Sequence, residues 1–143
     1  EKFLSAENQP KRMVLLVQKE VAKRIIDEKG SILSISVLAY GKPKYVETVK
    51  AGSFVPAPKV DSAVIAIENI SKKFFNGFSE ADFFKLVHAG FKFKRKKLSS
   101  NLATLFGREK TLKIFEKFGL DPNTRAEDVP IEMWGKLASL LVV

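Results

Sequence analysis

The sequence predicts a mixed α/β region over residues 1–73 and a small all-α region over residues 74–143. In the first region a short apolar run is followed at once by apolar residues at helical spacing, the order that is typical of α/β folds. Two more segments rich in β-branched residues lie before residue 70. In the second region no segment alternates as a strand does, and four segments have helical spacing. We therefore expect two domains.

The apolar run at residues 13–17 (MVLLV) is predicted as a strand. A continuous apolar run is typical of a strand that is buried on both faces of a parallel sheet. The helix after it should end near Gly30, which stands where a C-cap glycine belongs. Residues 31–40 (SILSISVLAY) allow two interpretations, because their β-branched residues suit a strand whereas Ser31 suits a helix N-cap. We predict a helix there.

Residues 44–50 and 61–68 are predicted as two further strands. They should be antiparallel, because the connection between them holds no helix.

The connection, residues 53–63 (SFVPAPKVDSA), is expected to be a stiff, non-helical loop. Pro56 and Pro58 fix their own backbone angles and restrict the residues before them. The loop should therefore present Phe54 and Lys59 in fixed directions. Phe54 either stacks on a base that has left its own helix or plugs the core beneath the strands, and from the residues alone the core position is the commoner one. Lys59 either contacts a phosphate or is simply solvated.

The all-α region should begin its first helix at Ser79, which forms a capping box with Asp82. Gly107 and Gly119 are expected to end the second and third helices, and Pro130 suits the first turn of the fourth. The four helices are predicted at residues 80–91, 94–106, 109–118 and 131–141.

The charge of the chain favours a polyanion as its partner, above all a nucleic acid. There are 25 Lys and Arg against 16 Asp and Glu, a formal net charge of +9. The charge is densest at residues 92–97 (KFKRKK), where basic residues surround Phe93. Lys and Arg contact phosphates, and Arg or Phe can stack on bases. The alternative is a solvated helix start, although cations at a helix N-terminus are unfavourable.

The composition also excludes several classes of site. With no cysteine and a single histidine, neither a disulfide nor a zinc site is expected. The longest internal apolar run is five residues, which is too short for a membrane helix, and there is no secretory signal pattern. The nearest glycines are 11 positions apart, so neither a G-x-G-x-x-G loop nor a P-loop can be present. We expect a soluble, cytoplasmic protein.

Four segments, in this order, resemble one known family, the small-subunit ribosomal RNA adenine dimethyltransferases of the KsgA/RsmA type. They are MVLLVQKEVAKRI at 13–25, SFVPAPKVDSAV at 53–64, FKFKRKKLSSNL at 91–102 and LDPNTRAEDVPIEMW at 120–134. The pair QKEVA and F-x-P-x-P-K-V-D-S-A is more specific than either match alone. The resemblance covers nearly the whole chain.

The resemblance implies a Rossmann-like domain that uses S-adenosylmethionine, followed by a small helical RNA-binding domain. Residues 1–73 would be the C-terminal part of the first, and residues 74–143 the second. Such enzymes place two methyl groups on N6 of each of two adjacent adenosines near the 3′ end of small-subunit ribosomal RNA, and take part in assembly of that subunit. The implied partner is that RNA or its precursor particle, with no membrane, and we expect a monomer.

The resemblance also assigns roles to residues. Phe54 would stack on the flipped target base, and Pro56 and Pro58 would hold its loop. The residues expected to contact RNA are Lys59, Lys92, Lys94, Arg95, Lys96, Lys97 and Asn101.

The chain departs from the family in one large respect. It contains neither the Gly-rich cofactor loop nor the Asn-Leu-Pro-Tyr motif that orients the adenine amine, and both are expected upstream of Glu1. The chain therefore resembles the C-terminal portion, and we expect the portion by itself to bind no cofactor and to be inactive. Phe93, Ser99 and Ser100 also stand where polar or basic residues are common in the family, which affects the details of RNA contact.

Two alternatives remain open from the sequence. One is the related Erm family, which methylates a large-subunit adenine; Asp61-Ser62 favours the small-subunit branch, since Erm proteins tend to carry Asn there. The other is a non-catalytic module that binds ribosomal RNA or the ribosome.

Overall fold

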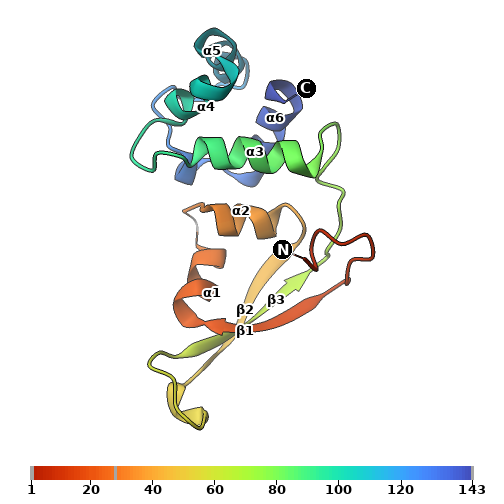
Figure 1. Cartoon of the computed structure of the whole chain (residues 1–143), viewed down its shortest axis with the longest axis vertical. Helices are drawn as coiled ribbons and strands as arrows, with labels where there is room; N and C mark the ends of the chain where they lie inside the picture. Colours follow the sequence, from red (N-terminus) through yellow and green to blue (C-terminus); the bar gives the residue numbers. More distant parts are fainter. Residues whose placement is uncertain (1, 28, 143) are drawn as a thin grey trace. The chain divides into compact units, whose positions relative to one another are not determined.

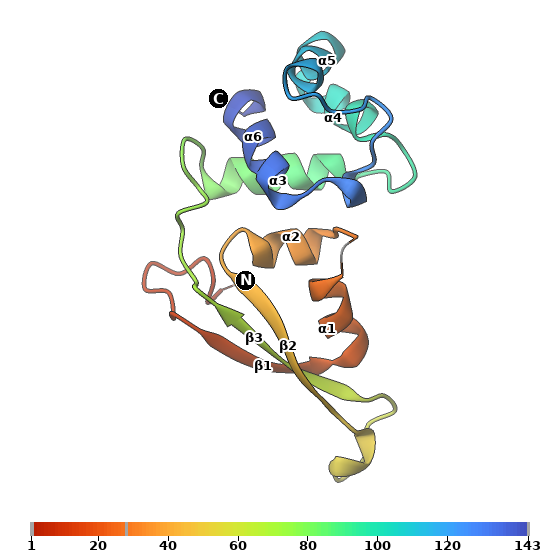
Figure 2. The same cartoon turned by 180° about the vertical axis from the view of Figure 1, so that it is seen from behind.

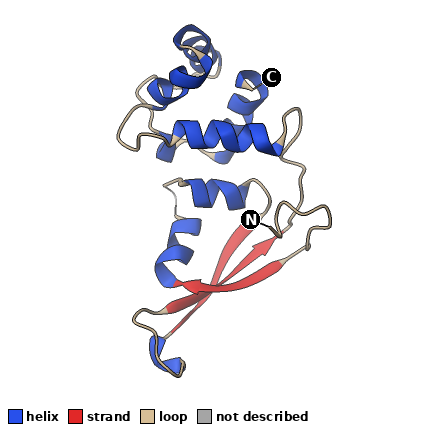
Figure 3. Cartoon of the chain, in the orientation of Figure 1, coloured by secondary structure: helices blue, strands red, loops and turns tan. Residues whose placement is uncertain are grey.

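Figure 1 shows the computed structural model of the chain, in which residues 2–27 and 29–142 are described. The chain divides into two compact units. The first holds the described residues up to 27 together with residues 33–72, and the second holds residues 29–32 and the described residues from 73 onward. The predicted mixed α/β class is confirmed, with the strands confined to the first unit (Figure 3).

The first unit is built on a three-stranded sheet. Strand β1 (Met13–Gln18) runs directly into helix α1 (Lys19–Ile26), and β2 (Lys42–Val49) and β3 (Ser62–Glu68) complete the sheet in the order β1-β3-β2. Both pairings are antiparallel, so the predicted relation of the two later strands is confirmed (Figure 2).

The prediction of a parallel sheet with β1 buried on both faces is wrong. β1 pairs antiparallel with β3, and its side chains alternate between half-buried and exposed. Val14 is 61% and Leu16 55% exposed, whereas Ile65 and Ile67 of β3 are fully buried. An antiparallel sheet can leave one face open in this way. In the described residues the second edge of β1 has no paired strand.

One face of the sheet is covered by α1, which packs on all three strands. Ala22 and Ile25 point inward from it and are buried. α1 ends at Ile26 with Asp27 as its C-cap, so Gly30 does not cap it as predicted. The segment with two interpretations is a helix, α2 (Ile32–Leu38), as predicted.

β2 begins two residues earlier than predicted and includes Pro43. Proline donates no ladder hydrogen bond, so it is tolerated only where a strand lies at an edge, and β2 is an edge strand. The register shifts between Tyr45 and Glu47, which leaves Val46 in a bulge with 51% of its surface exposed.

The second unit is all-helical. Its helices are α3 (Glu80–Gly90), α4 (Leu98–Phe106), α5 (Arg108–Lys117) and α6 (Ile131–Leu141). α3 packs on α4 and α6, and α5 packs on the same two helices. The Ser79 hydroxyl accepts the Asp82 amide hydrogen bond at 3.1 Å, which confirms the predicted cap. Pro130 is the N-cap of α6 rather than a residue of its first turn.

The core of this unit is aromatic. Trp134 and Phe115 are at most 1% exposed, and the Phe91 ring stacks on Trp134 with centroids 5.7 Å apart and planes at 18°. The segment before α3 contributes Phe74, whose ring meets Phe83 edge to face at 5.0 Å. Aromatic pairs of this kind add about 0.5–1.5 kcal/mol beyond area burial.

The longest helices, α3 and α6, have 11 residues each. None of the helices in the described ranges is long and apolar enough to cross a bilayer.

Candidate functional site

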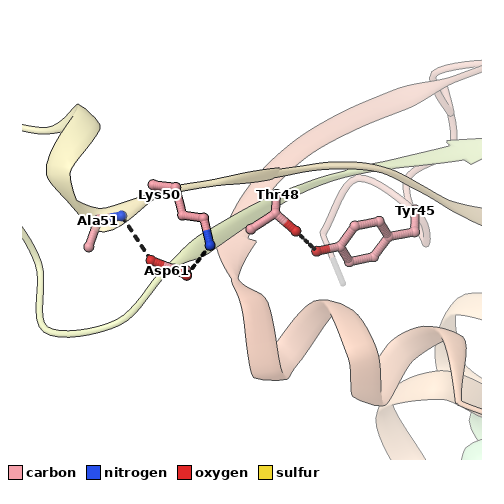
Figure 4. A network of polar contacts seen from close by, with 5 residues as sticks. All are labelled: Tyr45, Thr48, Lys50, Ala51 and Asp61. Atoms are coloured by element: carbon pink, nitrogen blue, oxygen red, sulfur yellow. Dashed lines mark hydrogen bonds and ion pairs between the residues drawn. The ribbon is translucent and has the colours of Figure 1, made fainter.

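The loop between β2 and β3 is closed at its base by Asp61 (Figure 4). One carboxylate oxygen of Asp61 accepts the Ala51 amide hydrogen bond at 2.9 Å, and the other lies 3.6 Å from the Lys50 ammonium. The Asp61 carbonyl accepts a hydrogen bond from the Lys19 amide at 3.0 Å, which ties the same residue to the start of α1. On β2, Tyr45 and Thr48 share a hydroxyl–hydroxyl hydrogen bond of 2.5 Å. The two ends of the loop are therefore fixed to each other and to a helix.

Phe54 lies directly after a short 3-10 turn, Ala51–Ser53, with an extended backbone. Its amide donates to the Ala51 carbonyl at 3.2 Å. The side chain is half-buried and does not belong to the buried core. Among the described aromatic residues none contacts its ring. The ring is therefore no fully buried core residue, and its role in base stacking stays a prediction.

The residues after Phe54 form the tip of the loop. Val55, Pro56, Pro58 and Lys59 are all exposed, and no regular element occupies this stretch. The prediction of a non-helical loop is confirmed for residues 54–61, whereas Ser53 belongs to the 3-10 turn. Whether these residues touch RNA stays a prediction.

The Asp61 contact should depend on pH. Its carboxylate accepts the Ala51 hydrogen bond and faces Lys50, and these contacts hold the pKa of Asp61 below its ordinary value of 3.8. Because the folded pKa is lowered, the contact is fully present above about pH 3.8 and is lost as the pH falls through the lowered folded value. We expect the NMR shift of the Ala51 amide proton to titrate with a midpoint below 3.8.

An Asp61→Asn variant provides the matched control. It keeps an oxygen that can accept the Ala51 hydrogen bond but has no charge to titrate. The amide shift should then be flat over the same acid range. A midpoint of the Ala51 amide shift at or above pH 3.8 in the wild type, or the same titration in Asp61→Asn, would contradict the role of the Asp61–Ala51 hydrogen bond.

An open hollow of about 510 Å³ lies beside the base of this loop. It is lined by Gln18, Lys19, Glu20, Lys23, Lys59, Val60 and Asp61. The lining carries three lysines against two carboxylates, so its net charge does not favour the cationic sulfonium and amino groups of S-adenosylmethionine. No Gly-rich turn is present to cradle the rest of that cofactor. In the described part of the chain, no group of three or more acidic or histidine side chains could hold a metal ion.

The basic loop, residues 92–97, lies between α3 and α4. It is not helical, so the prediction of a helix from residue 94 is wrong: α4 starts at Leu98 with Lys97 as its N-cap. The cations therefore precede the helix rather than occupy its first turn, where the macrodipole would disfavour them.

Every residue of the basic loop is exposed. None of its five cations lies within ion-pair distance of a carboxylate in the described ranges. The ammonium groups of Lys92 and Lys96 instead lie over the Phe93 ring, 5.6 and 4.6 Å from its centroid. Uncompensated cations in one short loop repel each other, so a bound polyanion would stabilise this arrangement.

The assignment of Asn101 as an RNA contact is wrong. Its side chain is 2% exposed, and its amide nitrogen donates to the carbonyls of Gly90 at 2.7 Å and Phe93 at 3.1 Å. Asn101 therefore holds the backbone at the start of the basic loop and does not reach solvent. A polar residue on the apolar side of a helix, as in LSSNLATLF, is the sequence signal for such a role.

The two serines that depart from the family pattern differ in their surroundings. Ser99 is buried and its hydroxyl donates to the Pro122 carbonyl at 2.9 Å, so it links α4 to the chain before α6. Ser100 is exposed and lines a hollow of about 410 Å³ together with Lys97 and Arg108. The cationic surface thus continues past the basic loop to the start of α5.

Known proteins are similar to this chain over nearly its whole length. The family model described as "Ribosomal RNA adenine dimethylase" matches residues 1–142. A "Ribosomal RNA small subunit methyltransferase A" of Dehalococcoides mccartyi strain 195 is 42% identical in an alignment of 139 residues, and the match covers 94% of this chain and 48% of that protein. The protein of the same name from Clostridium botulinum is 36% identical over 92% of this chain and 50% of its own length. The chain spans about half the length of these relatives.

Two solved structures share the fold. A dimethyladenosine transferase from Plasmodium falciparum superposes with a TM-score of 0.81 at 24% identity, over 95% of this chain and 58% of that one. The 23S ribosomal RNA methyltransferase ErmE superposes with a TM-score of 0.70 at 20% identity, over 99% of this chain and 58% of that one. With the family match over nearly its whole length and relatives above 30% identity, the chain belongs to the ribosomal RNA adenine dimethylase family.

Proposed function

We propose that this chain is the base-stacking and RNA-binding part of an enzyme that dimethylates N6 of two adjacent adenosines near the 3′ end of small-subunit ribosomal RNA. The observation that carries the proposal is the Phe54 loop. An incompletely buried aromatic ring is presented on a backbone whose two ends are joined through Asp61. Relatives named for small-subunit methylation support the choice of RNA.

In this proposal Phe54 forms one wall of the pocket for the target base. An adenine must leave its helix before its N6 can react, and an aromatic face holds the extruded base by stacking. Stacking on an aromatic side chain contributes about 1–3 kcal/mol per base. Pro56 and Pro58 restrict the loop, and Lys59, which is exposed, would meet a phosphate near the flipped nucleotide. The contribution of these residues is positioning.

The family transfers the methyl group of S-adenosylmethionine, but the residues of this chain do not fit that cofactor. The hollow beside the Phe54 loop has more lysines than carboxylates in its lining, and the chain has no Gly-rich turn. We therefore assign cofactor binding and the orientation of the adenine amine to the remaining half of the complete protein.

Residues 74–143 serve as the RNA-binding domain in this proposal. The basic loop supplies Lys92, Lys94, Arg95, Lys96 and Lys97, all exposed and free of carboxylate partners among the described residues. Each phosphate neutralised by such a cation releases counterions, so affinity should fall steeply with salt. We place the complete protein in the cytoplasm as a monomer on the small-subunit precursor.

The test compares the complete protein with the 143-residue chain. Purified small and large ribosomal subunits that lack the modification are incubated with labelled S-adenosylmethionine, and the nucleosides are analysed. We expect N6,N6-dimethyladenosine in small-subunit RNA only from the complete protein, and no heat of binding when the chain alone is titrated with the cofactor.

Other results would overturn parts of the proposal separately. Methylation of the large subunit alone would indicate an Erm-type enzyme. Binding to ribosomes without methylation of either subunit would indicate a non-catalytic module. Micromolar binding of the cofactor by the chain alone would contradict the assignment of that site to the other half.

A further inference from the structure

We propose that Phe93 is a second stacking site, which takes an unpaired base of the RNA at the basic loop. The inference rests on the proposed function, since it requires that the basic loop meets RNA. It assigns to the loop a contact with a base in addition to its contacts with phosphates.

The exposure of Phe93 distinguishes it from the other phenylalanines that the structure describes in the second unit. Its side chain is 46% exposed, and none of the other described aromatic rings contacts it. Phe91, two residues earlier, stacks on Trp134, and Phe74 and Phe83 pack on each other. A single exposed apolar residue is common on protein surfaces, so exposure alone decides nothing.

The second observation is the pair of ammonium groups over the Phe93 ring, those of Lys92 and Lys96. A cation over an exposed ring is worth about 0.5–1 kcal/mol, whereas a base stacked on the ring is worth about 1–3 kcal/mol. A base can therefore displace the flexible ammonium groups from the ring. The same groups then lie within reach of the phosphate that carries the stacked nucleotide.

The third observation is the anchoring of the Phe93 backbone. Its carbonyl accepts hydrogen bonds from the buried Asn101 side chain at 3.1 Å and from the Lys96 amide at 3.0 Å. Asn101 also holds the Gly90 carbonyl at 2.7 Å, so one buried side chain fixes the loop to the end of α3. An exposed ring on a fixed backbone loses little conformational freedom when a ligand binds.

These three observations together point to an unpaired nucleotide. Cations alone would suit any phosphate, including those of a duplex. The exposed Phe93 ring among these cations adds no affinity for a duplex, where the bases are already stacked on each other. It stabilises a base in a loop, a bulge or a single strand, where the base face is free.

The test measures binding of the complete protein to a labelled single-stranded RNA of 12 nucleotides at several KCl concentrations. Phe93→Ala should weaken binding by about 5- to 150-fold and leave the slope of log affinity against log salt unchanged, because no phosphate contact is lost. Phe93→Tyr should restore most of the affinity. Lys92→Ala, the matched control in the same loop, should reduce the magnitude of the slope by about 0.7.

A spectroscopic test reports on the ring itself. In Phe93→Trp, the added indole should lose fluorescence when the single-stranded RNA binds, relative to the wild-type protein, in which the buried Trp134 gives the background. A duplex of the same sequence should give no such loss. Thermal unfolding should change little in the Phe93 variants, since the side chain is exposed and stands outside the buried core.

The outcomes separate the two proposals. If Lys92→Ala weakens binding and Phe93→Ala does not, the stacking site is wrong and the RNA-binding loop stands. If substitution of the loop lysines by alanine changes neither the RNA affinity nor its salt slope, the proposal that the basic loop binds RNA is wrong. The proposed stacking site is then wrong as well. Fluorescence of Phe93→Trp that is unchanged by bound RNA also overturns the stacking site.

Discussion

Replacing Phe54 with alanine in the complete enzyme is expected to lower kcat/KM for methyl transfer by about one to two orders of magnitude. Stacking of a base on an aromatic ring is worth about 1–3 kcal/mol, and each 1.36 kcal/mol corresponds to a factor of ten in rate. The affinity for ribosomal RNA should change little, because in our proposal most of that affinity comes from cations on the second unit. The measurement pairs initial rates of methyl transfer with equilibrium RNA binding.

Two variants in the same loop control this result. Val55→Ala removes a fully exposed side chain next to Phe54 and should leave both measurements unchanged. Phe54→Tyr keeps the ring and should retain most of the activity. Equal losses of rate and RNA binding in Phe54→Ala, accompanied by a lower unfolding temperature, would show that Phe54 supports the fold and does not hold the base.

Gly90→Ala is expected to destabilise the second unit by about 1–3 kcal/mol, the usual cost of overpacking a core. A loss of stability would be informative, because Gly90 is the last residue of α3 and an alanine in place of a helical glycine ordinarily stabilises by up to about 0.5–1 kcal/mol. Here the new methyl group would lie 2.5 Å from Cη2 of Trp134 and 2.8 Å from Cδ1 of Leu98. Both side chains are fully buried and cannot move aside. Urea unfolding followed by circular dichroism measures the change.

A second effect of Gly90→Ala should appear in RNA binding. The Gly90 carbonyl accepts the Asn101 hydrogen bond, so a shift of this backbone disturbs the anchor of the basic loop. Gly52→Ala is the control, since its added methyl group meets nothing within 4 Å and should change stability by less than about 0.5 kcal/mol. A Gly90→Ala protein as stable as the wild type would contradict the close packing around Trp134.

Much of the secondary structure follows from local sequence signals. The cap of α3 could be predicted because Ser79 and Asp82 are three residues apart, the spacing of a capping box. The end of α4 could be predicted from Gly107, whose φ of 85° suits glycine. The pairing of the strands does not follow in the same way. The run MVLLV has no polar residue to mark the exposed face, so only the partner strand and the covering helix decide which side is buried.

In the candidate sites, too, local sequence predicts some features and not others. Two prolines predict an irregular loop that presents Phe54, because their restrictions act on the backbone itself. The clamp that closes this loop depends on Asp61 meeting Ala51, ten residues away, and nothing local specifies that contact. At the basic loop, the composition of the sequence identifies the cations. It does not predict that the buried Asn101 amide donates hydrogen bonds to two carbonyls, because that contact depends on how α3 and α4 pack.

The open side of β1 affects how the isolated chain will behave in the laboratory. An edge strand with unpaired main-chain groups is a template onto which another chain can add, and Val14 and Leu16 make this edge apolar as well. Concentrated samples of the 143-residue chain are thus prone to aggregate through the sheet. Light scattering during purification would distinguish this self-association from assembly on RNA. Where self-association occurs, Leu16→Lys should reduce it.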